Sequence, residues 1–382
     1  MLKNLFITTI FRPATGGIEL CLSNIIQRLP KRRAVVLTNK NGDESQSFDK
    51  SQKYPIYRKR LEMHFLKPKW LASPFFALQI ALKEKVEFVQ ATHGFASYIA
   101  AWSLKKLLGL PYFVWAYGLD ILAMQKSKML YYFVKRIYKE ACGGIANSKF
   151  TKQEMSRLGL PQEKISVVYP GVDGSYFKPG LAVEKVRKKY HIPAEKKILL
   201  SVSRLVSRKG FDLVIRALPT ILEKFPHTIY LLGGKGPDEA RLRTMVTKSS
   251  DPKIQEAVKF IGFVPDQDLP SLYNLADVFL MPSRQINEDV EGFGMVFLEA
   301  NACECPVIGG KSGGIPEAII DGKTGFLVDP GDPQDLASKV IKLLSDDTLR
   351  KRMGQIGRQR VLKEFNWGKI TKDFTKKLES LG

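Results

Sequence analysis

The sequence has little of what marks disulfide-rich, zinc-binding or membrane-spanning proteins. Its four cysteines, Cys21, Cys142, Cys303 and Cys305, include no CxxC pair, so neither a disulfide framework nor a zinc site is indicated. No apolar run approaches the ~18 residues that a membrane-spanning helix requires. The opening segment MLKNLFITTIFRP has too short an apolar part for a signal peptide and predicts a first strand. We therefore expect reduced thiols and a cytoplasmic protein.

Internal repeats and low-complexity tracts are also absent, which argues against a solenoid or a mainly disordered chain. Of the 382 residues, 44% are hydrophobic and 26% are charged, which is typical of a folded chain of two or three domains. The charge is unbalanced, because 60 Lys and Arg face 38 Asp and Glu. Residues 1–178 hold 28 of these basic and 12 of these acidic side chains. This half should attract anions such as nucleic acid, anionic lipid or a phosphorylated substrate.

Short apolar runs alternate with amphipathic stretches along the chain, which predicts an α/β fold with parallel sheets. The expected strands are NLFITTI, AVVLT, EFVQATH, YFVWAYG and GGIANS in the first half, and KILLSVSRL, TIYLLGG, VKFIGF, DVFLMPS and PVIGG in the second. One expected helix carries an apolar stripe at spacings of three and four, formed by Phe211, Val214, Leu218, Ile221, Leu222 and Phe225.

A break falls at residues 169–174, where YPGVDG follows the run KISVVY. We predict two doubly wound, Rossmann-like domains that face each other across a cleft, one over residues 1–172 and the other over 173–365. Residues 366–382 are expected to form a final amphipathic helix, with Asn366 as its N-cap.

Ligands of such domains bind where strands lead into helix N-termini. After the first strand, Gly16-Gly17 would let an anion approach the backbone, although a plain tight turn explains the pair as well. Arg204 and Lys209 flank the start of the helix near Phe211 and suit a diphosphate. About one residue in six is basic, so this second pair is weak evidence by itself.

The segment EGFGMVFLEANA is the most informative one. Gly292 and Gly294 should hold off the helix until Met295, leaving the N–H groups of residues 294–296 free for phosphate oxygens. Glu291 would then point to a neutral polyol, and Glu299 would accept hydrogen bonds from a vicinal diol such as ribose. The alternative is a helix cap at Glu291 and a solvated Glu299. The turn at residues 310–317 could form a wall of the same pocket.

These motifs together resemble the family-4 retaining glycosyltransferases of the GT-B fold. The features that carry the resemblance are the E-x7-E spacing of Glu291 and Glu299, the pair Arg204 and Lys209, the early Gly16-Gly17 and the PGVD segment. The stretch DVEGFGMVFLEANACECPVIGGKSGGIPEAI most resembles the bacterial phosphatidylinositol-mannoside mannosyltransferases, which use GDP-mannose.

The resemblance implies a role for each matching residue. Arg204 and Lys209 would hold the donor diphosphate, Glu299 its ribose, and Glu291 the hydroxyls of the transferred sugar; Glu291, Arg204 and Lys209 would serve catalysis. The other implied donor contacts are Gly16, Gly17, Phe293, Gly294, Met295 and Val296. Because these cations and helix ends would stabilise the leaving group, we expect no metal and no other cofactor. The last helix is implied to return to the first domain.

One stretch departs from the family. Where many members carry a His-Gly pair on the fourth strand of the first domain, this chain reads Ala116-Tyr117-Gly118-Leu119-Asp120. Tyr117 and Asp120 are therefore candidates for the sugar or acceptor site, with Tyr117 in place of the histidine. A His-Gly pair does occur at His93-Gly94, on the preceding strand, and we interpret His93 as structural.

The implied reaction moves a hexose with retention to a hydroxyl of a lipid or saccharide, as in lipopolysaccharide or glycolipid biosynthesis. Alternatives are a soluble enzyme that uses UDP-glucose or UDP-N-acetylglucosamine with a small anionic acceptor, and a GT-B epimerase or phosphorylase. A nucleic-acid-binding protein is disfavoured, because the basic residues form no known binding motif.

Aromatic and basic residues are interleaved in two segments of the first half, which suggests a peripheral position on the anionic inner face of the cell membrane. The first segment holds Arg58, Lys59, Arg60, Phe65, Lys67, Lys69, Trp70, Phe75 and Phe76; the second holds Tyr131, Tyr132, Phe133, Lys135, Arg136, Tyr138 and Lys139. Core aromatics beside solvated lysines are the alternative.

Overall fold

The computed structural model describes residues 2–14, 16–40, 44–63, 67–122, 124 and 127–379. It forms two compact units. The first contains the chain up to Gly171 together with the segment from Trp367 onward, and the second spans Val172–Asn366. The division falls inside the segment 169–174 at which the sequence analysis places the hinge.

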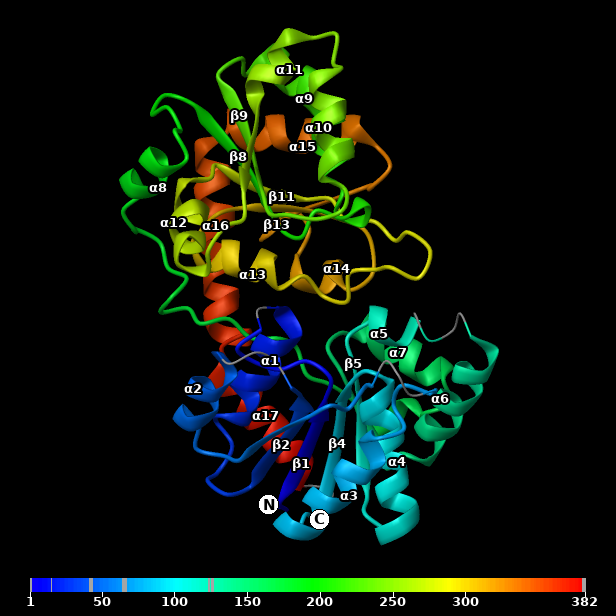
Figure 1. Cartoon of the computed structure of the whole chain (residues 1–382). Helices are drawn as coiled ribbons and strands as arrows, with labels where there is room; N and C mark the ends of the chain where they lie inside the picture. The colour runs from blue at the N-terminus through cyan, green and yellow to red at the C-terminus, as the bar shows by residue number, and fades with distance from the viewer. Residues whose placement is uncertain are drawn as a thin grey trace. The chain divides into compact units, whose positions relative to one another are not determined.

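The first unit is built on a parallel sheet in the order β3-β2-β1-β4-β5-β6-β7 (Figure 1). Its strands are β1 (Asn4–Thr8), β2 (Ala34–Asn39), β3 (Ile56–Lys59), β4 (Phe88–His93), β5 (Tyr112–Ala116), β6 (Gly143–Ala146) and β7 (Ile165–Val167). Because the strand order reverses between β1 and β4, the carboxyl ends of these two strands form a topological switch point, where ligands of such sheets bind.

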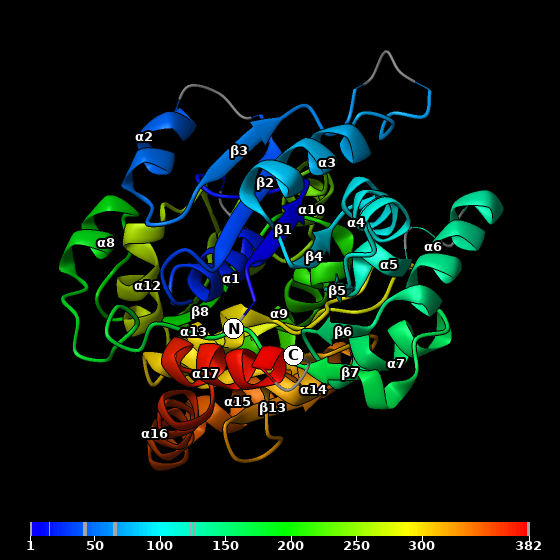
Figure 2. The ribbon, with the colours of Figure 1, turned by 90° about the horizontal axis from the view of Figure 1, so that it is seen from below.

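Helices cover both faces of this sheet. They are α1 (Gly17–Ile26), α2 (Glu44–Ser51), α3 (Ser73–Glu84), α4 (Phe95–Leu108), α5 (Leu119–Leu122), α6 (Lys128–Glu140) and α7 (Lys149–Arg157), with a 3₁₀ turn η2 (Gln162–Lys164). Figure 2 shows α3 and α4 on one side of the sheet and α1 on the other. Strands β1 and β5 are buried on both faces, which is why their sequences read as continuous apolar runs.

The final helix, α17 (Trp367–Glu379), packs onto the first unit, as the family resemblance implies. It contacts α1, and the ring of Phe374 meets Trp115 of β5 edge to face, with 5.2 Å between centroids. Its buried stripe comprises Trp367, Ile370, Thr371, Phe374 and Leu378. The helix therefore returns because its apolar stripe completes the core of the first unit.

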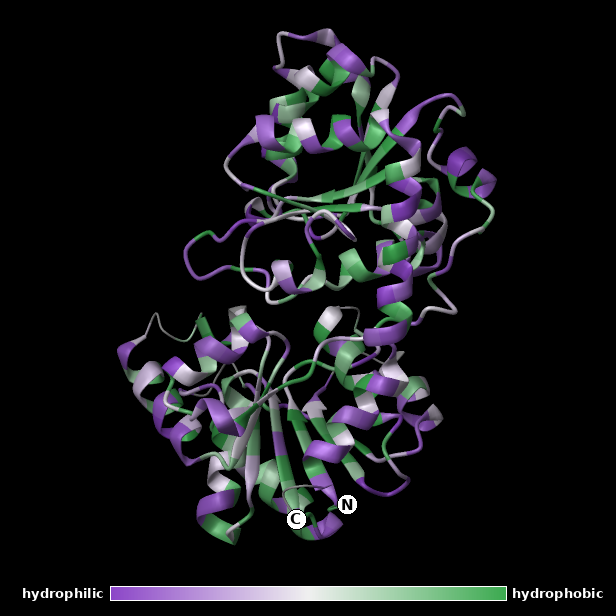
Figure 3. Cartoon of the chain, turned by 180° about the vertical axis from the view of Figure 1, so that it is seen from behind, coloured by the Kyte–Doolittle hydropathy of each residue, from purple (hydrophilic) through white to green (hydrophobic). Residues whose placement is uncertain are grey.

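The second unit carries a parallel sheet in the order β10-β9-β8-β11-β12-β13. Its strands are β8 (Lys197–Val202), β9 (Thr228–Gly233), β10 (Val258–Gly262), β11 (Val278–Met281), β12 (Val307–Gly310) and β13 (Gly325–Val328). Here the order reverses between β8 and β11, which places the switch point at the carboxyl ends of those two strands. Figure 3 shows the strands of this second sheet largely in the green of hydrophobic residues.

The helices of this unit are α8 (Glu184–Lys189), α9 (Phe211–Lys224), α10 (Glu239–Thr247), α11 (Pro252–Ala257), α12 (Leu269–Leu275), α13 (Met295–Ala302), α14 (Ile315–Ala318), α15 (Pro333–Ser345) and α16 (Asp347–Glu364), with 3₁₀ turns η3 (Ser207–Lys209) and η4 (Asp266–Asp268). The predicted stripe of α9 is buried from Phe211 to Leu222, and Phe225 packs against the same core. Within the described ranges, no helix combines the length and the apolarity needed to cross a membrane.

The expected strands all appear, and the structure adds β3, β7 and β13, which the sequence analysis did not predict; β7 lies in the run KISVVY that precedes the hinge. Strand β3 reads IYRK, lies at one edge of its sheet and is only half-buried, so it lacks an apolar run. Strand β13 is buried and lies at one edge of the second sheet. Its apolar run of four residues closely follows a turn and is too short to be recognised as a strand in the sequence.

Candidate donor site

The two loops at the switch point of the second sheet are in direct contact. Gly210, at the end of the β8–α9 loop, has φ +77°, and a Cβ atom there would come 2.2 Å from the carbonyl oxygen of Pro282, which follows β11. The N–H of Arg284 donates to the carbonyl of Arg208 over 2.8 Å. The loops that carry Arg204, Lys209 and Glu291 are therefore locked side by side where a ligand of this fold binds.

Glu291 lies between two cations. Its Oε2 atom is 2.5 Å from Nζ of Lys209 and 2.8 Å from Nη1 of Arg208. Burial alone would raise the pKa of Glu291, but the charges of Lys209 and Arg208 outweigh it and lower that pKa to about 2. Arg208 is in turn held by Asp289, whose Oδ1 lies 2.6 Å from Nε. Glu291 is thus ionised and fixed, and it does not cap α13.

The two predicted diphosphate ligands differ in environment. Arg204 is exposed, and none of the described residues bonds to its guanidinium group. Lys209 is buried, with 8% of its surface exposed. Burial lowers the pKa of the Lys209 ammonium, and the charge of Glu291 opposes that shift. Arg204 is therefore a free cation, whereas Lys209 is already committed to Glu291.

The turn at residues 310–317 packs against the loop that carries Glu291. A Cβ atom on Gly313 would lie 2.2 Å from the carbonyl oxygen of Glu291, and one on Gly314 would lie 2.0 Å from that of Gly292. The N–H of Gly314 also donates to the carbonyl of Glu291 over 3.0 Å. Glycine is required at both positions, since any side chain would push this loop away.

Helix α13 begins after Gly294, whose φ of +96° suits glycine. No side chain caps its N-terminus, so the first N–H groups, including those of Met295 and Val296, are available to an anion. Phe293 is different: its ring is buried and tilts against Phe365, 5.9 Å between centroids. Its side chain is therefore part of the core, so only the backbone of Phe293 could make the predicted contact with the donor.

Glu299 is buried on α13, 9% exposed, and accepts a hydrogen bond from the hydroxyl of Tyr273 over 3.0 Å. The expected alternative of a solvated Glu299 is wrong. Burial raises its pKa to about 7, and the Tyr273 hydrogen bond offsets only part of this shift. A buried carboxylate with one neutral partner can still accept further hydrogen bonds, as the predicted contact with a diol requires.

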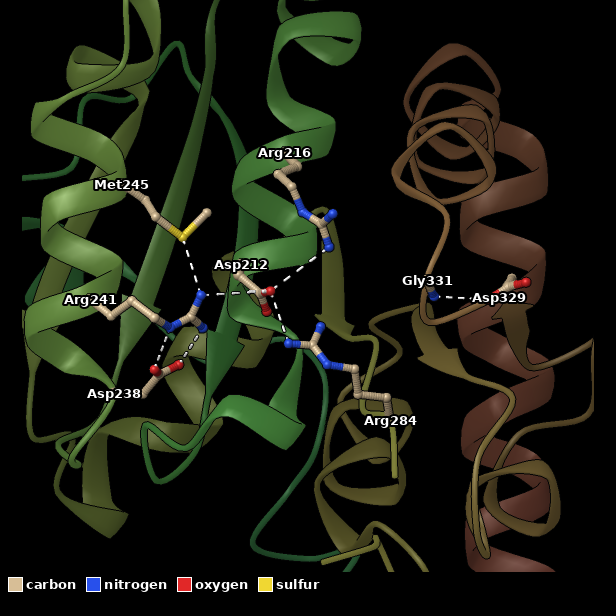
Figure 4. A network of polar contacts seen from close by, with 8 residues as sticks. All are labelled: Asp212, Arg216, Asp238, Arg241, Met245, Arg284, Asp329 and Gly331. Atoms are coloured by element: carbon tan, nitrogen blue, oxygen red, sulfur yellow. Dashed lines mark hydrogen bonds and ion pairs between the residues drawn. The ribbon is translucent and has the colours of Figure 1, made fainter. Parts of the chain in front are cut away.

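A set of arginines and aspartates braces these loops, and the sequence analysis missed it. Figure 4 shows Asp212, in the first turn of α9, reached by Arg284, Arg241 and Arg216. Arg284 Nη2 donates to Asp212 Oδ2 over 2.9 Å, which ties the β11 loop to the helix that follows Lys209. Arg284 lies three residues after the end of the central strand β11, and that position was the available signal. Among the described residues, no three His, Cys, Asp or Glu side chains cluster so as to hold a metal ion.

The remaining predicted residues belong to the first unit. Gly16 and Gly17 are exposed at the start of α1, and the Glu19 carboxylate folds back over Gly16, 2.3 Å from where a Cβ atom would stand. Tyr117 is buried, and its hydroxyl has no partner among the described residues. Asp120 accepts hydrogen bonds from the N–H of Tyr117 over 2.9 Å and from a tyrosine hydroxyl over 3.2 Å, so it holds the turn after β5.

Two family models match the chain, "Glycosyltransferase Family 4" over residues 15–176 and "Glycosyl transferases group 1" over residues 182–360. A Corynebacterium glutamicum GDP-mannose-dependent monoacylated alpha-(1-6)-phosphatidylinositol monomannoside mannosyltransferase is 30% identical over 99% of this chain and 98% of its own length. The chain belongs to the family-4 glycosyltransferases.

Other relatives of this family-4 glycosyltransferase match over part of their length. The GDP-mannose-dependent alpha-(1-6)-phosphatidylinositol monomannoside mannosyltransferase of Mycolicibacterium smegmatis is 38% identical over 58% of this chain. The aligned stretch spans 57% of that relative, so the match covers only about half of its length.

Solved structures support the GT-B fold. Anabaena HepE, in complex with UDP and glucose, superposes with a TM-score of 0.82 at 23% identity, over all of both chains. A sucrose-phosphate synthase from Thermosynechococcus elongatus superposes with a TM-score of 0.75 at 21% identity, over 99% of each chain. At these identities the likeness concerns the fold alone.

The raised pKa of Glu299 in this glycosyltransferase predicts a pH dependence of stability. Because its folded-state pKa is about 7 and its ordinary value is 4.5, the folded state binds more protons between these values, and the unfolding free energy falls as pH rises. From pH 5 to pH 8 this loss should amount to about 2–3 kcal/mol. Glu299→Gln removes the titrating group, so its unfolding free energy should not show this decrease between pH 5 and pH 8. Urea denaturation of both proteins at pH 5 and pH 8 measures it; parallel losses in both would contradict the prediction.

Proposed function

We propose that the protein is a retaining mannosyltransferase that moves mannose from GDP-mannose to a hydroxyl of a lipid or saccharide acceptor. The observation that carries this proposal is the contact of Glu291 with Lys209 at the switch point of the second sheet, beside the uncapped N-terminus of α13. A fixed carboxylate suits sugar hydroxyls, and cations with free N–H groups suit a diphosphate.

The chemistry assigned to these residues is electrostatic. As the bond between the sugar and the diphosphate breaks, negative charge grows on the leaving phosphate, and Arg204, Lys209 and the α13 N–H groups stabilise it. Glu291 holds the sugar. Retention would follow from departure and attack on the same face, with a diphosphate oxygen taking the proton of the acceptor hydroxyl. The protein supplies position and charge rather than a nucleophilic carboxylate.

The donor assignment draws on the relatives, two of which are named as GDP-mannose-dependent enzymes of phosphatidylinositol mannosides. A second candidate uses a UDP-linked glucose or N-acetylglucosamine and a small anionic acceptor. It is favoured by relatives named D-inositol 3-phosphate glycosyltransferase, of which the Corynebacterium jeikeium one is 35% identical over 53% of this chain.

The test is a donor screen. Purified protein is incubated with GDP-mannose, UDP-glucose or UDP-N-acetylglucosamine, with and without n-octyl α-mannoside or inositol 3-phosphate. Release of the nucleoside diphosphate and the anomeric configuration of the product are then measured. We expect turnover of GDP-mannose, an α-linked product and no change on adding EDTA. Turnover of the UDP donors alone would favour the second candidate, and turnover of none would reject both. The Arg204→Ala protein serves as the background control.

We also propose that the first unit docks on an anionic membrane surface, chiefly through α6. The exposed face of α6 carries Tyr132, which is 63% exposed, together with Lys135, Arg136 and Lys139. Tyr138 is fully buried and belongs to the core. In the first segment, Phe75 is exposed, but Arg58 is half-buried and pairs with Asp49, 2.8 Å between Nε and Oδ2, so its charge is already neutralised. Phe65 lies outside the described residues.

Vesicle binding tests this docking. Each exposed basic residue near an anionic leaflet is worth about 1 kcal/mol, so the double change Lys135→Glu and Lys139→Glu should weaken binding at least about tenfold. Co-sedimentation with phosphatidylglycerol-containing vesicles is compared with neutral vesicles and with high salt. The matched control is Lys185→Glu with Lys188→Glu, which changes the net charge equally on exposed positions of α8. Equal effects of the two pairs, or binding insensitive to lipid charge, would refute a role of α6.

A further inference from the structure

The ion pair of Lys209 with Glu291 stands in the way of a diphosphate. Lys209 is assigned to the leaving diphosphate, yet its Nζ atom lies 2.5 Å from Oε2 of Glu291. In the described part of the chain, this ammonium group has no other partner. A diphosphate carries more than one negative charge, so a lysine that it binds no longer balances the charge of Glu291.

Glu291 cannot rely on water to compensate for that loss. Its side chain is only 16% exposed, and a buried carboxylate without a cation takes up a proton. It would then change from a pure acceptor into a group that also donates. A second cation is present, however, because Nη1 of Arg208 lies 2.8 Å from the same Oε2 atom.

Arg208 is fixed independently of Lys209. Its Nε atom lies 2.6 Å from Oδ1 of Asp289, so this second carboxylate holds the other side of the guanidinium group. Its carbonyl accepts the N–H of Arg284 over 2.8 Å, and Arg284 is itself bonded to Asp212 over 2.9 Å. With 16% of its side chain exposed, Arg208 is held in place, whereas the Lys209 ammonium has one bond to give up.

The charges that reach Glu291 come from one short element. Burial raises the pKa of Glu291, and the charges of Lys209 and Arg208, both in η3, lower it. The turn at residues 310–317 meets the Glu291 loop through two glycines, which carry no charge. Helix α13 meets it through Gly294, where a Cβ atom would lie 3.8 Å from Cγ of Glu291. If Lys209 is withdrawn, Arg208 is thus the cation that remains.

We propose that Arg208 is a positioning residue, anchored by Asp289, that keeps Glu291 charged and in place when a nucleoside diphosphate draws Lys209 away. The inference rests on the proposed function, in which a nucleoside diphosphate is the leaving group. It goes beyond that function by giving a role to a residue that the sequence motifs left unassigned. Arg208 acts through Glu291 and needs no contact with the ligand.

Proton uptake on GDP binding tests this role. Calorimetric titration of the full chain at pH 6, in buffers of different ionisation enthalpy, counts the protons bound; titration of GDP itself is common to all variants. Arg208→Gln should take up about one proton more than the parent protein, because its Glu291 loses its last cation. Relative to the parent, its GDP affinity should rise up to about tenfold for each unit by which the pH falls.

Two further variants serve as controls in the same titration. Arg208→Lys retains the charge and should return proton uptake to the parent value. Arg243→Gln removes an arginine from an exposed pair on α10, where Nη2 lies 2.8 Å from Oε1 of Glu239. It matches the loss of one arginine that is paired with a glutamate, and we expect proton uptake equal to that of the parent.

Lys209→Ala imitates the withdrawal of the lysine without any ligand. Each protein is compared with a counterpart that also carries Glu291→Gln, which cancels other titrating groups such as Glu299. With Arg208 intact, the difference in melting temperature between counterparts should be the same at pH 5 and pH 8. When Arg208→Gln is added, the protein with Glu291 should lose about 2–4 °C more than its counterpart from pH 5 to pH 8, since a raised folded-state pKa means stability lost as pH rises.

Equal proton uptake by the parent, Arg208→Gln and Arg243→Gln would overturn the inference. So would a pH-dependent difference between Lys209→Ala and its counterpart, because Glu291 would then titrate despite the arginine. If neither GDP nor UDP binds the parent protein, the proposed function fails, and the melting comparison still decides the role of Arg208. If the protein without both cations does not fold, the Lys209→Ala comparison alone decides it.

Discussion

Replacing Arg204 with alanine should lower kcat/KM about 30- to 1,000-fold, because losing one preorganised electrostatic donor costs about 2–4 kcal/mol of transition-state stabilisation. The melting temperature should not change, since the guanidinium group is exposed and none of the described residues bonds to it. Lys209→Ala should lose a similar factor in kcat/KM. Unlike Arg204, however, Lys209 is buried and paired with Glu291. Its removal leaves that carboxylate with Arg208 as its remaining cation and should lower the unfolding free energy by about 1–3 kcal/mol.

Steady-state kinetics and thermal denaturation of the two variants check this contrast. Lys224→Ala, at the opposite end of α9 and exposed, is a matched control for the loss of one lysine, and we expect parent-like kinetics and stability. Near-normal kcat/KM in both Arg204→Ala and Lys209→Ala would remove the diphosphate assignment. Equal melting temperatures of all three variants would contradict the structural difference between the two cations.

Glu291→Gln should reduce kcat/KM about 100-fold or more while leaving GDP affinity at least as high as in the parent protein. The reason lies in the geometry of the pair. Glu291 is assigned to the sugar, which GDP lacks, and it now competes with a diphosphate for the ammonium group of Lys209, 2.5 Å away. An uncharged Gln still accepts a hydrogen bond but no longer holds Lys209 by charge, so the diphosphate meets a freer cation.

Calorimetric titration of GDP and UDP into Glu291→Gln and Glu299→Gln measures both roles. Glu299→Gln should weaken GDP binding, because an amide cannot accept two hydrogen bonds from the ribose hydroxyls as a carboxylate does. If both variants lose nucleotide affinity equally, the division between a sugar carboxylate and a ribose carboxylate is wrong. If neither loses activity, the donor site lies elsewhere.

Much of the fold could be predicted because its signals are local. The apolar runs that became β1, β2, β4, β5 and the central strands of the second sheet follow from burial on both faces of a parallel sheet. The glycines before α13 likewise predict where that helix begins, because their effect on the backbone does not depend on tertiary contacts. Strand β3 escaped prediction for the converse reason: a half-buried edge strand needs no apolar run.

The candidate site was predictable only as a set of residue types at strand ends. Lys209 and Arg208 are paired with Glu291, whereas Arg204 is not. These two contacts join residues that are 82 and 83 positions apart in the sequence. The Asp212–Arg284 brace spans 72 positions, and no periodicity signals it. Local sequence cannot report such pairs, because they exist only once the β8 and β11 loops are brought together.

By itself, then, the sequence determined the parallel α/β layering, the hinge segment, the return of the last helix and the residue types at each strand end, since each follows from local hydrophobicity, glycine content or a family motif. Only the tertiary structure decided the protonation states of those residues and their exposure to solvent. It buried Lys209, Glu299 and the ring of Phe293, left Arg204 exposed, and paired Arg58 with Asp49. The physical reason is that solvent access and the field of neighbouring charges are properties of packed surroundings, to which distant parts of the chain contribute.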